Sequence, residues 1–419
     1  MTEQTTATAG PGRAERRARV GVALVFLTNG LVFANLLPRY PQIKDSLGLS
    51  NTAMGVAVAA FPLGALLAGL AAGALVTRFR SSRVATFGMA AIGLGIVLVA
   101  VSPTWALLTA AMFLAGAADA IVDVAQNAHG LRVQRRYRRS ILNSFHAAWS
   151  IGAVLGGLMG SAAAGLAIPL PVHLGVSSVI SVVVAVAVYP LLLSGPEDGE
   201  RTGPAPAGRR PWSGLSPRVL VLILAFGLVA NSGTLVEDSG STWAAIYLQG
   251  SLGAVAAVAG LGFVALQGFQ FLGRLLGDRM VDRFGQRAMA RGGGLLVAAG
   301  MGLALAFPSV LGTIAGFGVA GFGVATLVPG AMTAADEVPG LPPGTGLTLV
   351  TWLMRVGFLV SPPVVGVVAD TISLRVGLIV VPLCGLLVLC LAVVLSARRS
   401  RSTDCHLVEP DVAEPDRTR

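Results

Sequence analysis

The chain has 419 residues, of which 54% are hydrophobic and only 12% are charged. Soluble domains carry about 25% charged residues, so this composition excludes an ordinary soluble protein and indicates an integral membrane protein. The formal net charge of +10 would favour a nucleic-acid partner in a soluble chain. In a membrane protein the position of the charges matters more than their sum, and we expect no nucleic-acid partner.

Twelve apolar stretches follow one another along the chain, each close to the roughly 20 residues that cross a bilayer. We place them at 20–38, 52–76, 84–102, 104–128, 142–165, 172–193, 217–236, 253–276, 288–307, 309–333, 344–369 and 375–396. A polar tail (1–19) precedes them, a Pro- and Gly-rich linker (194–216) divides them, and a disordered tail (397–419) follows. The sequence therefore predicts an all-α membrane protein with two six-helix bundles, 20–193 and 217–396.

The basic residues predict the orientation of these spans. With this placement the two tails lie on one side of the membrane, and 26 of the 30 basic residues lie in the tails, the linker and the loops on that side, or at the span ends that flank them. By the positive-inside rule both termini and the linker are cytoplasmic. All but one of the basic residues are arginine, which, with the abundant Ala and Gly, indicates a G+C-rich bacterial genome and hence the bacterial plasma membrane.

The fourth and fifth spans carry ionisable residues that are costly in a bilayer. Asp119, Asp123 and Asn127 recur at four-residue spacing and share one helix face. His146 lies as far from the centre of the following loop as Asp123, so in an antiparallel hairpin the two could face each other. We predict proton coupling at Asp123, with His146 and Asp119 tuning its proton affinity. The alternative is a neutral His146 that donates to a backbone carbonyl.

Other polar residues within spans are candidates for binding a solute. Arg355 shares a face of the eleventh span with Trp352. Its guanidinium keeps its charge in the bilayer, so it needs an anion, either Asp119 or an acidic group of the solute; a purely structural ion pair is the alternative. Four amides could bind hydroxyl groups or could join helices; these are Asn29, Asn127, Gln267 and Gln270.

The seventh span ends in Glu237 and Asp238, followed by Trp243 and Tyr247. Aromatic residues at this level are typical of anchors at the membrane surface. The two acids could gate the outer mouth, or they could simply begin a solvated loop.

Two loops suggest an internal duplication. Thr77-Arg78-Phe79 after the second span and Asp282-Arg283-Phe284 after the eighth lie 205 positions apart. The six-plus-six layout and "GDRMVDRFGQR" (277–287) resemble the major facilitator superfamily over residues 20–396. The resemblance implies two halves that rock about a midplane site, and a gating motif formed by Asp282, Arg283, Gly285 and Arg287. The first-half copy keeps Arg78 but has Thr77 and Arg80 where Asp and Gly are expected.

The segment Asp123-Val-Ala-Gln-Asn127 resembles the acid-x-x-x-Asn pattern in the fourth helix of fucose-permease-like members. In that branch the acid is linked to proton coupling and sugar binding. These members also carry an acid in the first helix, where this chain has only asparagines.

We therefore expect a secondary transporter, most simply a proton-coupled symporter of a polar solute such as a sugar or sugar acid. The alternative is proton-antiport efflux of a drug or metabolite, although the fifth span lacks the proline found in the superfamily's antiporters. The scattered histidines and cysteines predict no enzyme, no metal and no cofactor. The expected partners are the solute, protons and the lipid bilayer, and the expected state is a monomer.

Overall fold

The computed structural model describes residues 12–137, 141–195, 216–339, 341 and 344–395. This part of the chain contains no strand and has twelve helical segments that are long and apolar enough to cross a membrane. The predicted all-α fold of twelve spans is confirmed. The predicted tail 397–419 and most of the linker 194–216 lie outside the described residues, whereas part of the tail 1–19 is helical from Arg13.

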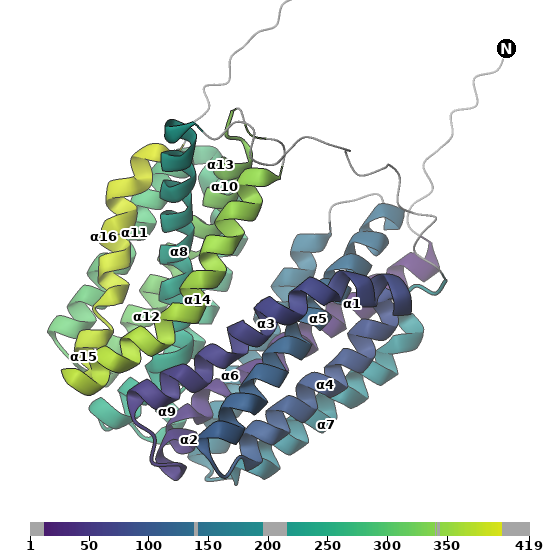
Figure 1. Ribbon diagram of the computed structural model, residues 1–419, viewed down its shortest axis with the longest axis horizontal. Helices are drawn as coiled ribbons and strands as arrows, with labels where there is room; N and C mark the ends of the chain where they lie inside the picture. Colours follow the sequence, from purple (N-terminus) through teal and green to yellow (C-terminus); the bar gives the residue numbers. More distant parts are fainter. Residues whose placement is uncertain (1–11, 138–140, 196–215, 340, 342–343, 396–419) are drawn as a thin grey trace, which may run out of the picture.

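The helices form two bundles, purple to blue and teal to yellow in Figure 1. The first comprises α1 (Arg13–Ala34), η1 (Leu37–Arg39), α2 (Tyr40–Ser46), α3 (Asn51–Phe79), α4 (Ser81–Val101), α5 (Trp105–Tyr137), α6 (Leu142–Gly165), α7 (Leu170–Val188) and η2 (Tyr189–Leu191). The second comprises α8 (Pro217–Ile246), η4 (Tyr247–Ser251), α9 (Ala256–Ala259), α10 (Leu261–Phe284), α11 (Gln286–Ala306), α12 (Val310–Val324), α13 (Leu327–Asp336), α14 (Thr345–Thr371), α15 (Leu374–Gly377), α16 (Val380–Leu391) and η5 (Ala392–Val394).

Helix α8 extends well past the predicted end of the seventh span at residue 236. It continues to Ile246 and passes into the π-helical turn η4. Asp238, Trp243 and Tyr247 are only 7%, 0% and 1% exposed, so neither a solvated loop start nor surface anchors occur here. The hydropathy pattern ended this span too early because its polar residues face neighbouring helices rather than lipid.

Two sharp turns connect helices without a loop, and they occupy equivalent positions in the two bundles. Arg80 separates α3 from α4 with φ +71°, and Gly285 separates α10 from α11 with φ +83°. Glycine adopts such a backbone freely, whereas a side chain makes it strained. The first bundle therefore keeps the turn without the residue that suits it.

Helices α1 and α6 pack backbone against backbone. A Cβ on Gly152 of α6 would overlap the carbonyl oxygen of Leu27, and one on Gly30 of α1 would overlap the carbonyl oxygen of Trp149. Small residues permit this approach where lipid provides no hydrophobic drive for helix pairing. One glycine in each helix thus fixes how α1 and α6 cross.

The two bundles meet at one end of the molecule, which carries α2, α9 and α15, and diverge toward the end where α8 begins (Figure 1). We call the first the joined end. There α3 lies against α14, with Gly55 so near Pro362 that a Cβ would overlap its carbonyl oxygen. The bundles also touch along a second line, where Gly157 of α6 lies against Val264 of α10. We call this contact the seam between α6 and α10.

Candidate functional site

Three side chains from three helices of the first bundle form a hydrogen-bonded chain. The Asn29 amide nitrogen on α1 donates to Oδ1 of Asp119 on α5 over 2.9 Å. The indole nitrogen of Trp149 on α6 donates to the Asn29 amide oxygen over 2.8 Å. Asn29 is 3% exposed, so its amide satisfies both neighbours and holds the carboxylate in place. The sequence singled out Asn29 and Asp119 but missed Trp149, one turn beyond His146.

The second bundle also has a carboxylate within a membrane-spanning helix, that of Glu237 on α8. Oε2 of Glu237 on α8 accepts from the Gln270 amide of α10 over 2.9 Å. Arg274, one turn further along α10, lies 3.7 Å from the same oxygen and keeps 39% of its side chain exposed. Arg274 lies within α10, and within the predicted eighth span 253–276.

His146 connects the two bundles electrostatically. The exposed imidazole lies within electrostatic range of Asp123 on α5 and of Arg274 on α10. Its ring also packs edge-on against Phe26, with centroids 5.3 Å apart. Asp123 and His146 therefore lie within electrostatic range of each other, but within the described residues no hydrogen bond joins their side chains.

The Asp123 carboxylate is exposed and receives its hydrogen bonds from its own helix. Oδ1 accepts from the amides of Gln126 at 3.2 Å and Asn127 at 2.9 Å. Asn127 also donates to the Asp123 backbone carbonyl. The predicted solute ligand Asn127 thus positions the carboxylate in this conformation.

Arg355 lies on the face of α14 turned toward the first bundle. Its guanidinium is exposed and reaches to within 3.8 Å of where a Cβ on Gly69 of α3 would lie. Trp352, one turn away, is 50% exposed. Among the described residues Arg355 forms no ion pair, and Asp119, one of its two predicted partners, binds Asn29 instead. The guanidinium is left available to an anion from outside the chain.

Unsatisfied amide oxygens add acceptors to the second bundle. Gln267 and Gln270 are 4% and 2% exposed, and the amide oxygen of each lacks a hydrogen-bond partner in the described part of the chain. The same is true of Asn231 on α8, whose oxygen a Cβ on Gly357 would overlap. Buried polar atoms are normally paired, so these acceptors are candidates for a solute or for water.

Comparison with known proteins supplies the family. The profile described as Major Facilitator Superfamily matches residues 22–253 and again 237–410. The chain belongs to the major facilitator superfamily. It is therefore a transporter and not an enzyme, and a multi-pass membrane protein.

Its relatives in the superfamily cover most of its length. An uncharacterized MFS-type transporter of Yersinia pestis is 29% identical over 85% of this chain and 90% of its own. Membrane protein MosC of Rhizobium meliloti is 28% identical over 90% of both chains. Among solved structures, the nucleoside transporter NupG matches with a TM-score of 0.71 at 12% identity, over 91% of this chain and 99% of its own. A D-xylose–proton symporter matches with a TM-score of 0.70 at 16% identity, over 92% and 98%.

The loop that resembles the superfamily's gating motif is anchored by one of its basic residues. Arg287 donates to the backbone oxygens of Leu395, over 3.0 Å, and Val393, over 2.9 Å. It thereby ties the start of α11 to the end of the last span. Asp282 is exposed, and the latch that the resemblance implies for it stays a prediction.

The two copies of this loop share one further contact. The guanidinium of Arg78 lies over Phe79 at 5.6 Å, and that of Arg283 lies over Phe284 at 5.4 Å. Each arginine therefore packs against the phenylalanine that follows it, at equivalent positions of the superfamily's two bundles.

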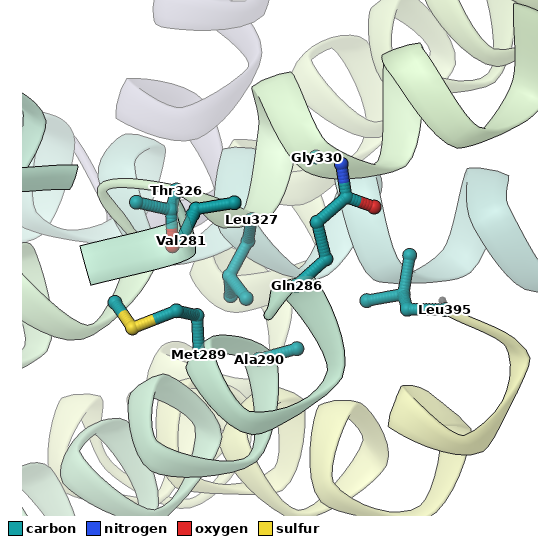
Figure 2. A pocket seen from close by; sticks show the side chains of 8 residues that line it. All are labelled: Val281, Gln286, Met289, Ala290, Thr326, Leu327, Gly330 and Leu395. Carbon is teal, nitrogen blue, oxygen red and sulfur yellow. The ribbon is translucent and has the colours of Figure 1, made fainter. Parts of the chain in front are cut away.

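A small pocket lies beside the second loop, with about 210 Å³ of empty space partly open to solvent. Mostly apolar side chains line it, among them Val281, Met289 and Leu327, and Gln286 is its longest polar one (Figure 2). The lining includes none of the charged candidate residues Asp119, Asp123, His146, Glu237, Arg274 and Arg355. This pocket therefore has no part in the candidate site.

Proposed function

We propose that this transporter is a proton-coupled symporter of a small polar solute, such as a sugar or sugar acid, in the bacterial plasma membrane. One observation carries the proposal. The first bundle holds two carboxylates in fixed positions, Asp119 and Asp123, and the second bundle holds two exposed guanidinium groups, those of Arg274 and Arg355. Carboxylates within membrane spans can take up and release protons, and guanidinium groups are suited to an anionic or hydroxyl-rich solute.

In this proposal the proton site lies in the first bundle. Asp123 exchanges protons because its carboxylate is exposed, and His146 beside it responds to the same change of charge. Asp119, one turn deeper on the face of α5, is fixed by Asn29 and adjusts the proton affinity of Asp123 through its own charge. Protonation removes negative charge from the first bundle and so alters its attraction to Arg274 across the seam.

The solute site lies mainly in the second bundle. Arg355 would bind an acidic or hydroxyl group, Trp352 would pack against a ring face, and the free amide oxygens of Gln267 and Gln270 would accept from hydroxyl groups. A D-xylose–proton symporter has the same fold, which agrees with this assignment.

Transport would proceed by alternating access. With the termini cytoplasmic, as the positive-inside rule predicts, the joined end faces outward and the bundles diverge toward the cytoplasm. Rocking about the site would close the diverging end and part the joined end. A bacterial homologue of Spinster solved in an inward-facing conformation matches this fold with a TM-score of 0.70 at 13% identity, over 92% of this chain and 98% of its own.

Proton-antiport efflux is the second candidate. Asp119, Asp123 and Glu237 outnumber Arg274 and Arg355, and this excess of acid would attract a cation. The exposed Arg355 opposes that reading because it would repel the same cation.

The deciding experiment measures ligand-induced thermal stabilisation of the purified protein and, in proteoliposomes, solute uptake driven by a pH gradient. A ligand that binds only the folded form stabilises it by about 2.7 kcal/mol at a hundredfold excess over Kd. We expect stabilisation by a sugar or sugar acid that is lost in Arg355→Ala, and uptake that no longer responds to the gradient in Asp123→Asn. Asp45→Asn, an exposed acid of α2, is the control. Stabilisation by lipophilic cations alone would favour efflux instead.

A further inference from the structure

Asp238 is a buried carboxylate that the proposed solute and proton sites do not use. It lies on α8 and is 7% exposed, near the joined end, where α8 meets α2 of the first bundle and α14 of its own (Figure 1). Any movement that parts the bundles at this end changes its surroundings.

The hydrogen bonds of this carboxylate are incomplete. Oδ1 accepts from the hydroxyl of Thr242 over 3.3 Å, whereas Oδ2 has no partner within the described residues. The hydroxyl of Ser361 on α14 lies beside it, and Tyr40 on α2, 1% exposed, faces it from the other bundle. The hydroxyl oxygens of Ser361 and Tyr40 also lack partners in this part of the chain.

Among the described residues, no positive charge compensates Asp238. The titratable groups that face it are Tyr40 from α2 and Glu237 from its own helix, and α14 presents the neutral Ser361. The nearby cations are engaged elsewhere: Arg39 donates to Gln42, Ile168 and His173, and Arg375 donates to the carbonyls of Leu305 and Ala306.

A buried, unpaired carboxylate is much more costly to keep ionised than neutral. A proton on Oδ2 removes that cost and turns the oxygen into a donor, for which the oxygens of Tyr40 and Ser361 are free acceptors. The one proton would therefore satisfy the orphaned Asp238 oxygen and a hydroxyl oxygen together.

We propose that Asp238 is a proton-binding site in the seam between the bundles, occupied while the joined end is closed and emptied when that end opens to water. The proton comes from water at the joined end, forms an O–H bond to Oδ2, and returns to water there on opening. This inference rests on the alternating access of the proposed function. Because the joined state binds this proton more tightly, acid at that side favours closure and alkali favours opening.

The test measures how fast a membrane-impermeant maleimide labels a cysteine in the seam between α6 and α10. The reporter is Val264→Cys in a chain whose three native cysteines are replaced. Because maleimide reacts with the thiolate, each labelling rate is divided by that of free cysteine at the same pH. With Asp238 present, we expect this normalised rate, measured from the joined-end side, to rise severalfold between about pH 5 and about pH 8. Asp238→Asn, neutral at every pH, should give a low normalised rate that does not change with pH.

Three further variants make the result specific. Asp238→Glu should restore the pH dependence, and Tyr40→Phe, which removes a hydrogen-bond acceptor for the proton, should label faster at low pH. Asp45→Asn, an exposed acid at the same end, should keep the original profile. A pH dependence retained in Asp238→Asn, or absent from the parent chain, overturns the inference. Flattening in Asp123→Asn but not in Asp238→Asn would leave the proposed function standing and refute this site alone.

Discussion

The carboxylate of Asp370, at the end of α14, accepts hydrogen bonds from both the backbone N–H and the side-chain amide of Asn51, each over 2.9 Å, where α3 begins in the other bundle. The N–H of Thr52 donates to the second carboxylate oxygen over 2.7 Å. The last turn of α14 thus caps the first turn of α3, and the negative charge lies at the positive end of the α3 dipole.

Removing this cap should loosen the joined end. We expect Asp370→Ala to cost the closed state about 1 kcal/mol, the usual value of a helix N-cap, and to shift the populations roughly fivefold toward opening. Asp370→Asn keeps an acceptor without the charge and should fall between. Pulsed electron paramagnetic resonance between spin labels at Ser50 and Ser373 would report the longer distances. An unchanged distance distribution in Asp370→Ala would rule out a latch at this position.

Replacing Arg80 by glycine should stabilise the protein. The residue holds φ at +71°, a conformation that costs a side chain roughly 1–3 kcal/mol. Arg80→Gly should raise the thermal midpoint in detergent, and Gly285→Ala should lower it. The control is Arg83→Gly, the same exchange inside α4, which should lower the midpoint because glycine weakens a helix. A lower midpoint for Arg80→Gly would show that the arginine side chain contributes more than its backbone strain costs.

Asn29 should be far more sensitive than its neighbour in the sequence. Asn29→Ala leaves both Asp119 and the Trp149 indole without their partner, and the hydrogen bond to the carboxylate alone is worth about 1.5–3 kcal/mol. We expect proton-driven uptake to fall roughly tenfold or more. Thr28→Ala removes a hydroxyl that bonds only to Leu24 of the same helix and should transport almost normally. Equal losses in the two variants would mean that α1 is disturbed generally.

The crossing of α1 and α6 should not tolerate a methyl group. Gly152→Ala would press a Cβ into the Leu27 carbonyl, and overpacking of this kind typically costs about 1–3 kcal/mol. Gly175→Ala in α7 places the same group where no atom lies within 4 Å and should be neutral or slightly stabilising. Thermal midpoints measured side by side would separate steric overlap from a general effect of alanine.

The number of spans follows from length and hydropathy, because lipid forces every backbone group to bond within its own helix. Helix ends are less accessible to this reasoning, as the burial of Asp238 beyond residue 236 shows. Polar residues that face other helices carry the same hydropathy as residues in a loop.

Periodicity placed Asp119, Asp123 and Asn127 on one face, and hairpin depth brought His146 near Asp123. Neither argument could show which group each of these side chains is hydrogen-bonded to. Asp123 bonds along its own helix, whereas Asp119 bonds to Asn29 on another. That choice depends on how α1 and α5 cross. The position of Trp149, one turn beyond His146, could have drawn attention to it. A hydropathy pattern, however, counts tryptophan as apolar and does not reveal its indole N–H donor.

The close packing of Gly30 against Trp149, and of Gly152 against Leu27, has a consequence for selectivity. Because α1 and α6 pack backbone against backbone, neither helix can slide or rotate past the other without a steric clash. Asn29 and Trp149 therefore move together as part of one rigid unit throughout the transport cycle. Accommodation of different solutes must then come from the second bundle, where Arg274 and Arg355 carry long side chains that remain partly exposed. Changing what this transporter carries should require substitutions on α10 and α14, while the first bundle keeps a fixed template.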